Sequence, residues 1–313
     1  MSFTLHQLQI FAKVAEYKSM TKAAEALDMS QPSVSIQMKK LEEHMGLELF
    51  EVIGKQLYLT EAGRSLWVTQ KRLSQELDHL DMTFDKLKGS TTGSLHIAAV
   101  STAKYIMPYI LGSFRKPHQD IAISMNVSNR AEVIEELRNN ACDFAVFTQL
   151  PDDLELETLE FIDHPLVLAA PPEHPLIGQS LQWEDLKDEN FIYREKGSGT
   201  RMMMEKLMSK HKIPLQPVME LSTNEAVKQA IMAGIGISLI SEVSLTLERE
   251  LGYIAELEVC GLPLHTSWKL VHLKDKQLSP LAQTFKQFIS TIQPNDILPF
   301  NNHLDHLKSK LNP

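Results

Sequence analysis

Residues 19–41 of this 313-residue chain hold two short helical patterns joined by a tight turn. Apolar side chains recur at helical spacing in both: Ala23, Ala24 and Leu27 in the first, then Val34, Met38 and Leu41 in the second. Ser30 and Pro32 are a start signal for the second helix, because proline needs no N–H partner in a first turn. The segment therefore predicts a helix-turn-helix.

The outer face of the second helix is polar, and its amide, hydroxyl and ammonium groups suit base edges and phosphates in a major groove. We predict that the motif and its surroundings bind double-stranded DNA through these residues: Thr21, Lys22, Gln31, Pro32, Ser33, Ser35, Gln37, Lys39, Lys40 and Lys55. The alternative is a helical hairpin without a DNA partner, since any two amphipathic helices with a short turn give this pattern.

The flanks of the motif extend the prediction to a winged helix-turn-helix over residues 1–60. An amphipathic helix precedes the motif, with its apolar face at Leu5, Leu8, Phe11, Val14 and Ala15. After the motif, apolar and polar residues alternate around Gly54, which predicts a two-stranded ribbon that turns there.

The charge balance argues against a large basic surface. Residues 1–90 carry eleven Lys and Arg against twelve Asp and Glu, and the formal net charge of the chain is −9. A DNA-binding domain is expected to have a basic footprint, so the lysines around the motif have to act locally. We therefore expect modest affinity for each DNA half-site, with oligomerisation supplying the rest.

A long helical run over residues 61–90 carries an apolar seam. Its spacings alternate between four and three residues, interrupted at Gln70, and its members are Leu66, Leu73, Leu77, Leu80, Phe84 and Leu87. The seam is narrow for burial within one globular domain, so we predict that these residues form a coiled coil between two copies of the chain. The alternative is a helix that lies on its own domain.

Composition is that of an ordinary globular protein, with 43% hydrophobic and 23% charged residues. No run of about 18 apolar residues appears and no signal-peptide pattern opens the chain, so we expect a cytoplasmic protein with no membrane partner. Cys142 and Cys260 lie far apart and are expected to be packed thiols. The twelve histidines show no metal spacing and no nucleophile–base pair is recognisable, so we predict no cofactor and no enzyme activity.

Strand and helix patterns alternate over residues 91–292, which predicts an α/β region with parallel sheets covered by helices. Polar segments follow several strands and open helices, where α/β proteins bind ligands. The predicted effector-binding residues are Ser101, Thr102, Asn129, Thr148, Gln149, Ser198, Thr200, Arg201, Ser222 and Asn224. A carboxylate or phosphate metabolite would suit them, although a helix cap is the better explanation of Ser101, Ser198 or Ser222 taken alone. The remaining polar segment, 293–313, is expected to be a loosely held tail.

Segments 23–24, 30–35, 41–42 and 59–63, together with the seam and the α/β region, resemble the LysR-type transcriptional regulators over about residues 5–292. Further segments resemble the Calvin-cycle (RuBisCO operon) branch of that family: 50–60, 129–134, 222–230, and 261–264 with 278–280. Val52 and Gln56 depart from the family at the wing, where polar or basic side chains are usual. Ile36 likewise replaces a common polar residue and suits a thymine methyl group.

The resemblance implies a regulator in three parts: a winged helix-turn-helix at 1–60, a dimerising linker helix at 61–90, and an effector domain at 91–292 with two lobes like those of periplasmic binding proteins. Lobe I would comprise 91–162 and 267–292, and lobe II 163–266. The resemblance also implies a dimer of dimers that bends an interrupted palindromic operator, with RNA polymerase as a further partner and a small molecule between the lobes. The main alternative is a regulator of a nitrogen, sulfur or respiratory operon. A solute-binding module or enzyme with a helical adapter is the other.

Overall fold

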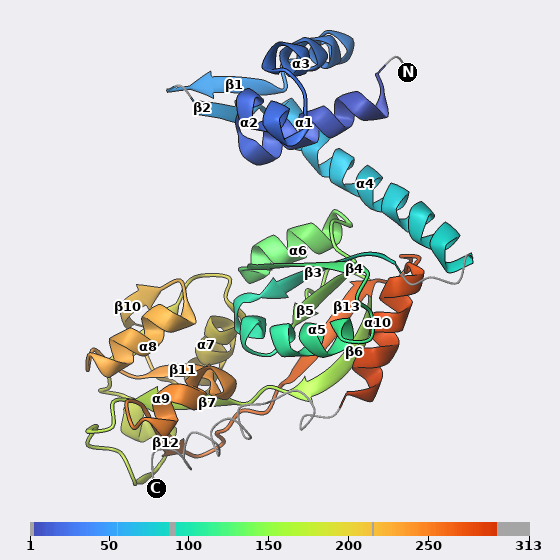
Figure 1. Cartoon of the computed structure of the whole chain (residues 1–313). Coiled ribbons are helices and arrows are strands. Elements are labelled where there is room, and N and C mark those ends of the chain that lie inside the picture. Colours follow the sequence, from blue (N-terminus) through green and yellow to red (C-terminus); the bar gives the residue numbers. More distant parts are fainter. Residues whose placement is uncertain (1–2, 55, 88–91, 215, 293–313) are drawn as a thin grey trace, which may run out of the picture. The chain divides into compact units, whose positions relative to one another are not determined.

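The computed structural model describes residues 3–54, 56–87, 92–214 and 216–292. The chain divides into two compact units, Met1–Asp81 and Met82–Pro313, whose helices and strands are labelled in Figure 1. Lys55 of the predicted wing, part of the predicted linker and the predicted tail at 293–313 lie outside the described residues. Among the described helices, none has the length and hydropathy that crossing a bilayer requires.

The first unit is a winged helix-turn-helix. Its elements are α1 (Leu5–Tyr17), α2 (Met20–Ala26), α3 (Gln31–Met45), the antiparallel ribbon of β1 (Phe50–Ile53) and β2 (Gln56–Leu59), and most of α4 (Glu61–Leu87). Hydroxyl caps begin the first three helices: Thr4, Ser19 and Ser30 each accept a bond from the backbone N–H three residues on. The predicted apolar faces meet in one core, except that Leu5 is exposed and Ala15, although buried, does not belong to that core.

Thr60 and Gly63 join the ribbon to α4. The Thr60 hydroxyl donates to the carbonyl of Glu48 and accepts a bond from the N–H of Gly63. Gly63 approaches the ribbon so closely that a Cβ there would lie 2.0 Å from the carbonyl oxygen of Leu49. The long helix is therefore positioned by backbone contact at this glycine.

The seam of α4 divides into two halves. Leu66 and Leu73 are half-buried against the core of their own unit, so the alternative interpretation of the seam describes them better than intermolecular pairing does. Exposed apolar side chains continue the seam at Leu77, Leu80 and Phe84. The side chain of Leu87 lies outside the described residues.

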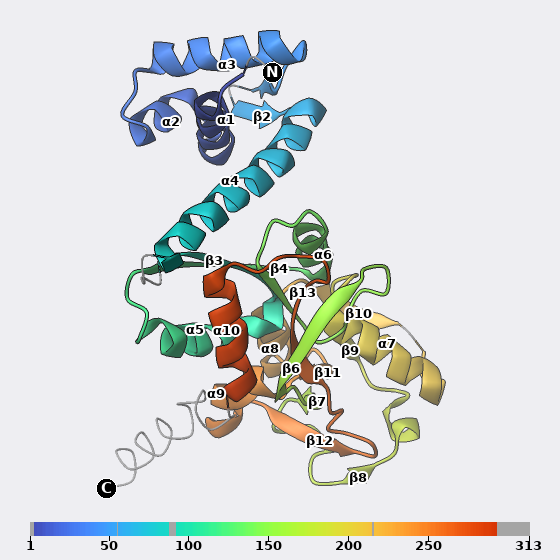
Figure 2. The ribbon, with the colours of Figure 1, turned by 90° about the vertical axis from the view of Figure 1, so that its right-hand side faces the viewer.

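The first lobe of the second unit is built on a five-stranded sheet in the order β4-β3-β5-β13-β6. Its strands are β3 (Gly93–Val100), β4 (Ile121–Ser128), β5 (Phe144–Phe147), β6 (Leu156–Asp163) and β13 (Ser267–Leu273). Helices α5 (Met107–Arg115) and α10 (Pro280–Thr291) cover one face and α6 (Arg130–Arg138) covers the other (Figure 2). Because β5 is buried on both faces, it is apolar at every position.

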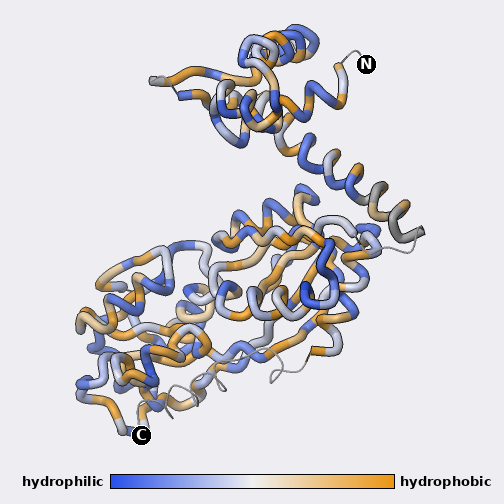
Figure 3. The backbone as a smooth tube through the Cα atoms, viewed as in Figure 1, coloured by the Kyte–Doolittle hydropathy of each residue, from blue (hydrophilic) through white to orange (hydrophobic). Residues whose placement is uncertain are grey.

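The second lobe has a four-stranded sheet, β11-β7-β12-β8, and a parallel pair, β9 and β10. Its strands are β7 (Leu166–Ala170), β8 (Ser180–Leu181), β9 (Phe191–Arg194), β10 (Pro217–Leu221), β11 (Ser238–Ser241) and β12 (Ala255–Val259). Its helices are α7 (Gly199–His211), α8 (Asn224–Met232) and α9 (Thr246–Glu250), with the short 3-10 helices η2 (Trp183–Leu186) and η3 (Glu242–Leu245). The first lobe has one short 3-10 helix among its described residues, η1 (Ser101–Tyr105). Hydrophobic residues concentrate in the inner strands of both lobes (Figure 3).

The sheets are mixed rather than parallel as predicted. Strands β3, β4 and β5 are parallel, but β13 runs antiparallel to β5 and β6, and β7 runs antiparallel to β11 and β12. The chain passes from the first lobe to the second after β6 and returns before β13, so β6 and β13 lie side by side in opposite directions. Strand patterns alone do not reveal such a return.

Candidate DNA interface and effector cavity

Helix α3 presents its polar face to solvent. Ser30 caps the helix and Pro32 lies in its first turn, so Gln31 stands at the first helical position. Most of the predicted DNA-binding residues are exposed: Thr21, Lys22, Gln31, Pro32, Ser35, Lys39 and Lys40. The segment that begins at Gln31 is therefore accessible to a duplex.

Two predicted DNA-binding residues are partly engaged within the unit. Gln37 is half-buried, and its amide oxygen accepts a bond from Gln7 Nε2 at 3.1 Å. The hydroxyl of Ser33 lies 2.7 Å from that of Ser30. Gln37 thus ties α3 to α1. Lys55 lies outside the described residues.

Apolar side chains share this outer surface. Val52 and Ile53 of the wing are 71% and 58% exposed, and Ile36 on α3 is 54% exposed. A branched apolar side chain suits the methyl group of thymine in the major groove. Val52 and Ile53 cannot bond phosphates through their side chains, so at these positions the wing offers apolar contact.

A small cavity lies where the carboxyl ends of β3, β4 and β5 meet the start of α7. Most of the predicted effector-binding residues line it: Ser101, Thr102, Asn129, Thr148, Gln149, Ser198 and Thr200. Parallel strands end at the same edge of a sheet, and that edge is where open α/β sheets bind ligands. The free space in it is about 20 Å³, room for about one water molecule, so a metabolite can enter only when the lining side chains or the lobes move apart.

Arg201 does not line the cavity. It is buried, donates to the carbonyl oxygen of Arg194 at 2.9 Å, and pairs with Glu205 at 2.7 Å and Glu220 at 2.6 Å. These hydrogen bonds keep the pKa of Arg201 above its ordinary value, although burial opposes the shift. Its charge is therefore neutralised inside the second lobe.

Ser222 and Asn224 also lie outside the lining and act through Arg194. The carbonyl oxygen of Ser222 and the side-chain oxygen of Asn224 accept bonds from its guanidinium group. The cap of α8 is Thr223 rather than Ser222. These two residues support the cavity wall instead of facing the cavity.

Charged residues also line the cavity: Arg130, which directly follows the predicted Asn129 in the polar segment after β4, and Arg194 and Glu195, which were not predicted from the sequence. Arg194 is 3% exposed and ends β9. It donates through Nη2 to the hydroxyl of Ser101 at 3.1 Å, which joins the two lobes. Arg130 donates to the carbonyl oxygens of Gln149 and Leu150. The available signal was the position of Arg194, a charged residue directly after three apolar strand residues.

The start of α7 makes the cavity suitable for an anion. Ser198 is the N-cap residue of this 13-residue helix, but its side chain makes no capping bond. The first N–H groups of a helix have no partner within the helix, and its dipole is positive at this end. A helix N-terminus of this kind attracts carboxylates and phosphates, and Arg130 adds to that attraction, whereas Arg194 is paired with Glu195.

Further hydrogen bonds join η1 of the first lobe to α8 of the second. Lys104 and Tyr105 both donate to the carboxylate of Glu225. Desolvation raises the pKa of Glu225, but the bonds from Lys104 and Tyr105 outweigh it and lower the pKa to about 2. The carboxylate therefore stays charged, and the contact between the lobes is maintained, throughout the neutral range.

His164 lies where the chain first crosses between the lobes. Its backbone N–H donates to the carbonyl oxygen of Thr266 at 2.7 Å, and its ring packs on Trp268 with centroids 4.4 Å apart. The ring is contacted at Nδ1 by Thr266 Oγ1 at 3.0 Å, whereas Nε2 has no partner among the residues that the structure describes. Burial lowers the pKa of His164 to about 4.

Acidification is expected to destabilise the second unit through His164. Its pKa is about 4 when folded and 6.5 ordinarily, so between these values the unfolded chain takes up the proton first. The free energy of unfolding should fall as the pH drops through this window, by up to about 3 kcal/mol at about 1.4 kcal/mol per pKa unit. Denaturant unfolding from neutral pH to about pH 4.5 measures this slope. The slope should flatten in His164→Phe and persist in the control His265→Gln; equal slopes in all three would contradict it.

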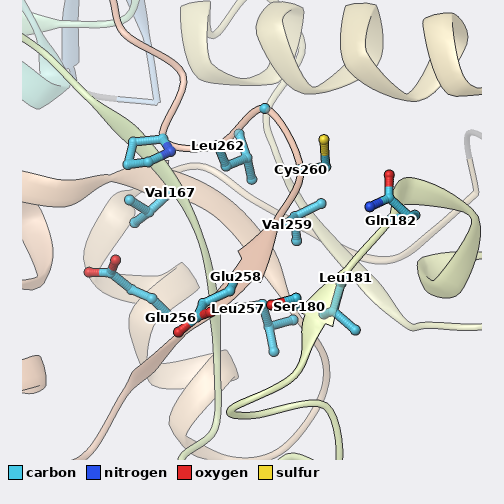
Figure 4. Close-up of a pocket in the computed structure, with 12 residues that line it drawn as sticks. Val167, Ser180, Leu181, Gln182, Glu256, Leu257, Glu258, Val259, Cys260 and Leu262 are labelled. Carbon is cyan, nitrogen blue, oxygen red and sulfur yellow. The ribbon is translucent and has the colours of Figure 1, made fainter.

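A second groove, of about 420 Å³, runs along β12 and β8 (Figure 4). Glu256 and Glu258 line it, and among the described residues of its lining none is basic. The groove is therefore unsuited to an anion. Cys260 borders it and is exposed, which corrects the expectation of a packed thiol, whereas Cys142 is buried.

Family models match both units of the chain. Residues 5–64 match the bacterial regulatory helix-turn-helix protein model of the lysR family, and residues 88–292 match the LysR substrate binding domain. The chain belongs to the LysR family of DNA-binding transcriptional regulators.

Two similar relatives span nearly the whole chain. The HTH-type transcriptional activator CmpR of Synechocystis sp. is 42% identical over 91% of this chain and 94% of its own length. The RuBisCO operon transcriptional regulator of Allochromatium vinosum is 40% identical over 92% of this chain and 96% of its own length.

Solved structures share the fold. The regulatory domain of Synechocystis CcmR in complex with 2-PG is 36% identical, with a TM-score of 0.62 over 64% of this chain and 98% of that one. CbnR, a LysR family transcriptional regulator, has 21% identity and a TM-score of 0.71 over 93% of this chain and 100% of its own. The second likeness concerns the fold alone.

Proposed function

We propose that this protein regulates carbon-fixation genes in response to a small anionic metabolite bound in the cavity between its lobes. The relatives named for the RuBisCO operon support the target genes. The relative solved with 2-PG supports the class of effector. The observation that carries the effector assignment is the convergence of Arg130, Arg194 and the start of α7 on one cavity.

The exposed face of α3 supports reading of DNA through the segment that begins at Gln31. In a symmetric dimer two such helices meet successive turns of an interrupted palindrome. Exposed Leu77, Leu80 and Phe84 support pairing through the second half of α4, and we assign Leu66 and Leu73 to the core of the first unit. We further propose a dimer of dimers that acts in the cytoplasm without catalysis, with RNA polymerase as a partner.

The cavity also suggests how an effector alters the operator complex. It is lined by residues of both lobes, so a bound anion would bridge them and favour one lobe arrangement over others. The effector can shift that equilibrium only by the difference between its affinities for the two arrangements. Ser198 and Thr102, one from each lobe, are the hydroxyls that we expect to contact it.

Hydroxyl removal tests this assignment. Ser198→Ala and Thr102→Val are each expected to weaken 2-PG binding about tenfold, since a hydrogen bond to a charged group contributes about 1.5–3 kcal/mol. Operator affinity without the effector should stay within about twofold. The measurement is titration of 2-PG into the full-length protein bound to an operator that immunoprecipitation and sequencing have identified. The control is Thr158→Val, at an exposed position of β6. An unchanged response in both cavity variants would refute the cavity assignment.

A further inference from the structure

The guanidinium group of Arg194 is held by its neighbour Glu195. Nε donates to Glu195 Oε2 at 2.8 Å and Nη2 donates to Oε1 at 3.0 Å, so both carboxylate oxygens accept a hydrogen bond from the arginine. Such paired bonds are the geometry with which arginine binds carboxylates and phosphates. Glu195 therefore uses the face of Arg194 that an anionic ligand would need.

Both residues belong to the cavity. Arg194 is 3% exposed and the side chain of Glu195 is 22% exposed, so the pair is poorly screened by water. Among the described residues that line the cavity, Glu195 carries the one acidic side chain, opposite the basic contribution of Arg130 and the start of α7. A carboxylate at this place repels the class of ligand that the rest of the cavity attracts.

We propose that Glu195 is a built-in competitor for the anionic group of the effector. An incoming phosphate or carboxylate takes the paired bonds of Arg194 by displacing the Glu195 side chain. This inference rests on the proposed function, because it concerns the affinity of the same cavity for the same class of ligand. Its consequence is that Glu195 sets a threshold: ligands that cannot replace a carboxylate on Arg194 do not bind.

The remaining partners of Arg194 explain how displacement reaches the lobes. Arg194 also donates to Ser101 Oγ of the first lobe at 3.1 Å and to the carbonyl oxygen of Ser222 at 3.3 Å. These bonds hold the guanidinium in place when the carboxylate leaves, since they use different acceptors. The exchange of one anion for another thus occurs at a residue that is bonded to both lobes.

Calorimetric titration of the full-length protein with 2-PG and with inorganic phosphate tests the competitor. Glu195→Gln keeps an acceptor beside Arg194 but removes the charge, so its Kd for 2-PG should fall at least about tenfold, equivalent to about 1.4 kcal/mol. Glu195→Asp keeps the charge on a shorter side chain and should give a smaller gain. Glu184→Gln, an exposed glutamate of η2 in the same lobe, should leave the Kd unchanged.

The outcomes separate this inference from the proposed function. If the wild type binds 2-PG and Glu195→Gln binds it equally or more weakly, the competitor is refuted while the effector cavity stands. If the wild type, Glu195→Gln and Glu195→Asp all fail to bind 2-PG and phosphate, the proposed anionic effector is refuted and the competitor is refuted with it. If thermal unfolding shows that Glu195→Gln does not fold, Glu195→Asp replaces it as the test. A gain in its affinity for 2-PG supports the competitor, and an equal or weaker affinity refutes it.

Discussion

Gly63→Ala is expected to unfold or severely loosen the winged helix-turn-helix. The added Cβ would lie 2.0 Å from the carbonyl oxygen of Leu49 and 2.9 Å from Leu59 Cδ2. Backbone cannot yield as a flexible side chain does, so α4 or the ribbon has to move. Overpacking typically costs about 1–3 kcal/mol, and we expect about 3 kcal/mol here because the obstructing atom belongs to the backbone.

Denaturant unfolding of the full-length protein, followed by circular dichroism, measures the loss. The control is Ser65→Ala, at an exposed position of α4 close to Gly63, where alanine favours the helix. Gly63→Ala should also abolish DNA binding, because the core under α3 includes Leu49 and Leu59. A Gly63→Ala protein with the stability of Ser65→Ala would show that the close approach is not present in solution.

Gln31→Ala is expected to weaken operator binding about 100-fold while leaving binding to random DNA within about twofold. A glutamine that bonds a base edge through both amide atoms contributes about 1–3 kcal/mol of discrimination. We take about tenfold for each half-site, and a symmetric dimer contains the residue twice. Gln31 is exposed at the first position of α3, where recognition helices contact bases.

Fluorescence anisotropy with operator and scrambled duplexes at fixed salt separates the two affinities. Gln9→Ala, an exposed glutamine of α1, is the control and should change neither. An equal loss on both duplexes would mean that Gln31 contacts the DNA backbone. The residues that read bases would then have to be other residues of α3.

The first unit was predictable because its signals are local. Apolar spacing, hydroxyl caps and Pro32 each report on neighbours within one helix turn, and the structure uses all of them. The burial of Leu66 and Leu73 was not predictable, since it depends on which surface α4 meets rather than on its own spacing. The prediction that Leu5 faces the core was wrong for the same reason, because a helical pattern does not reveal where the core ends.

The position of the cavity between the lobes was predicted, but the charged residues Arg194 and Glu195 in its lining were not. Strand ends are visible in a sequence, so Ser101, Asn129 and Thr148 could be brought together. Pairing of charges across distant segments is not visible, and for that reason Arg201 was chosen although its charge is neutralised within lobe II. Arg194 was missed because its partners Ser101, Ser222 and Asn224 lie on two segments far from it in the sequence.

The central claim is that paired α3 helices read bases in the major groove through the segment that begins at Gln31. Interference by 7-deazapurines, which remove the N7 acceptor from the major groove, tests it most directly with the full-length protein on its operator. We predict sensitive purines in two half-sites spaced by whole helical turns of about 10 base pairs, and loss of sensitivity at one purine of each half-site in Gln31→Ala. Identical interference patterns for the wild type and Gln31→Ala, or no major-groove interference at all, would contradict the claim.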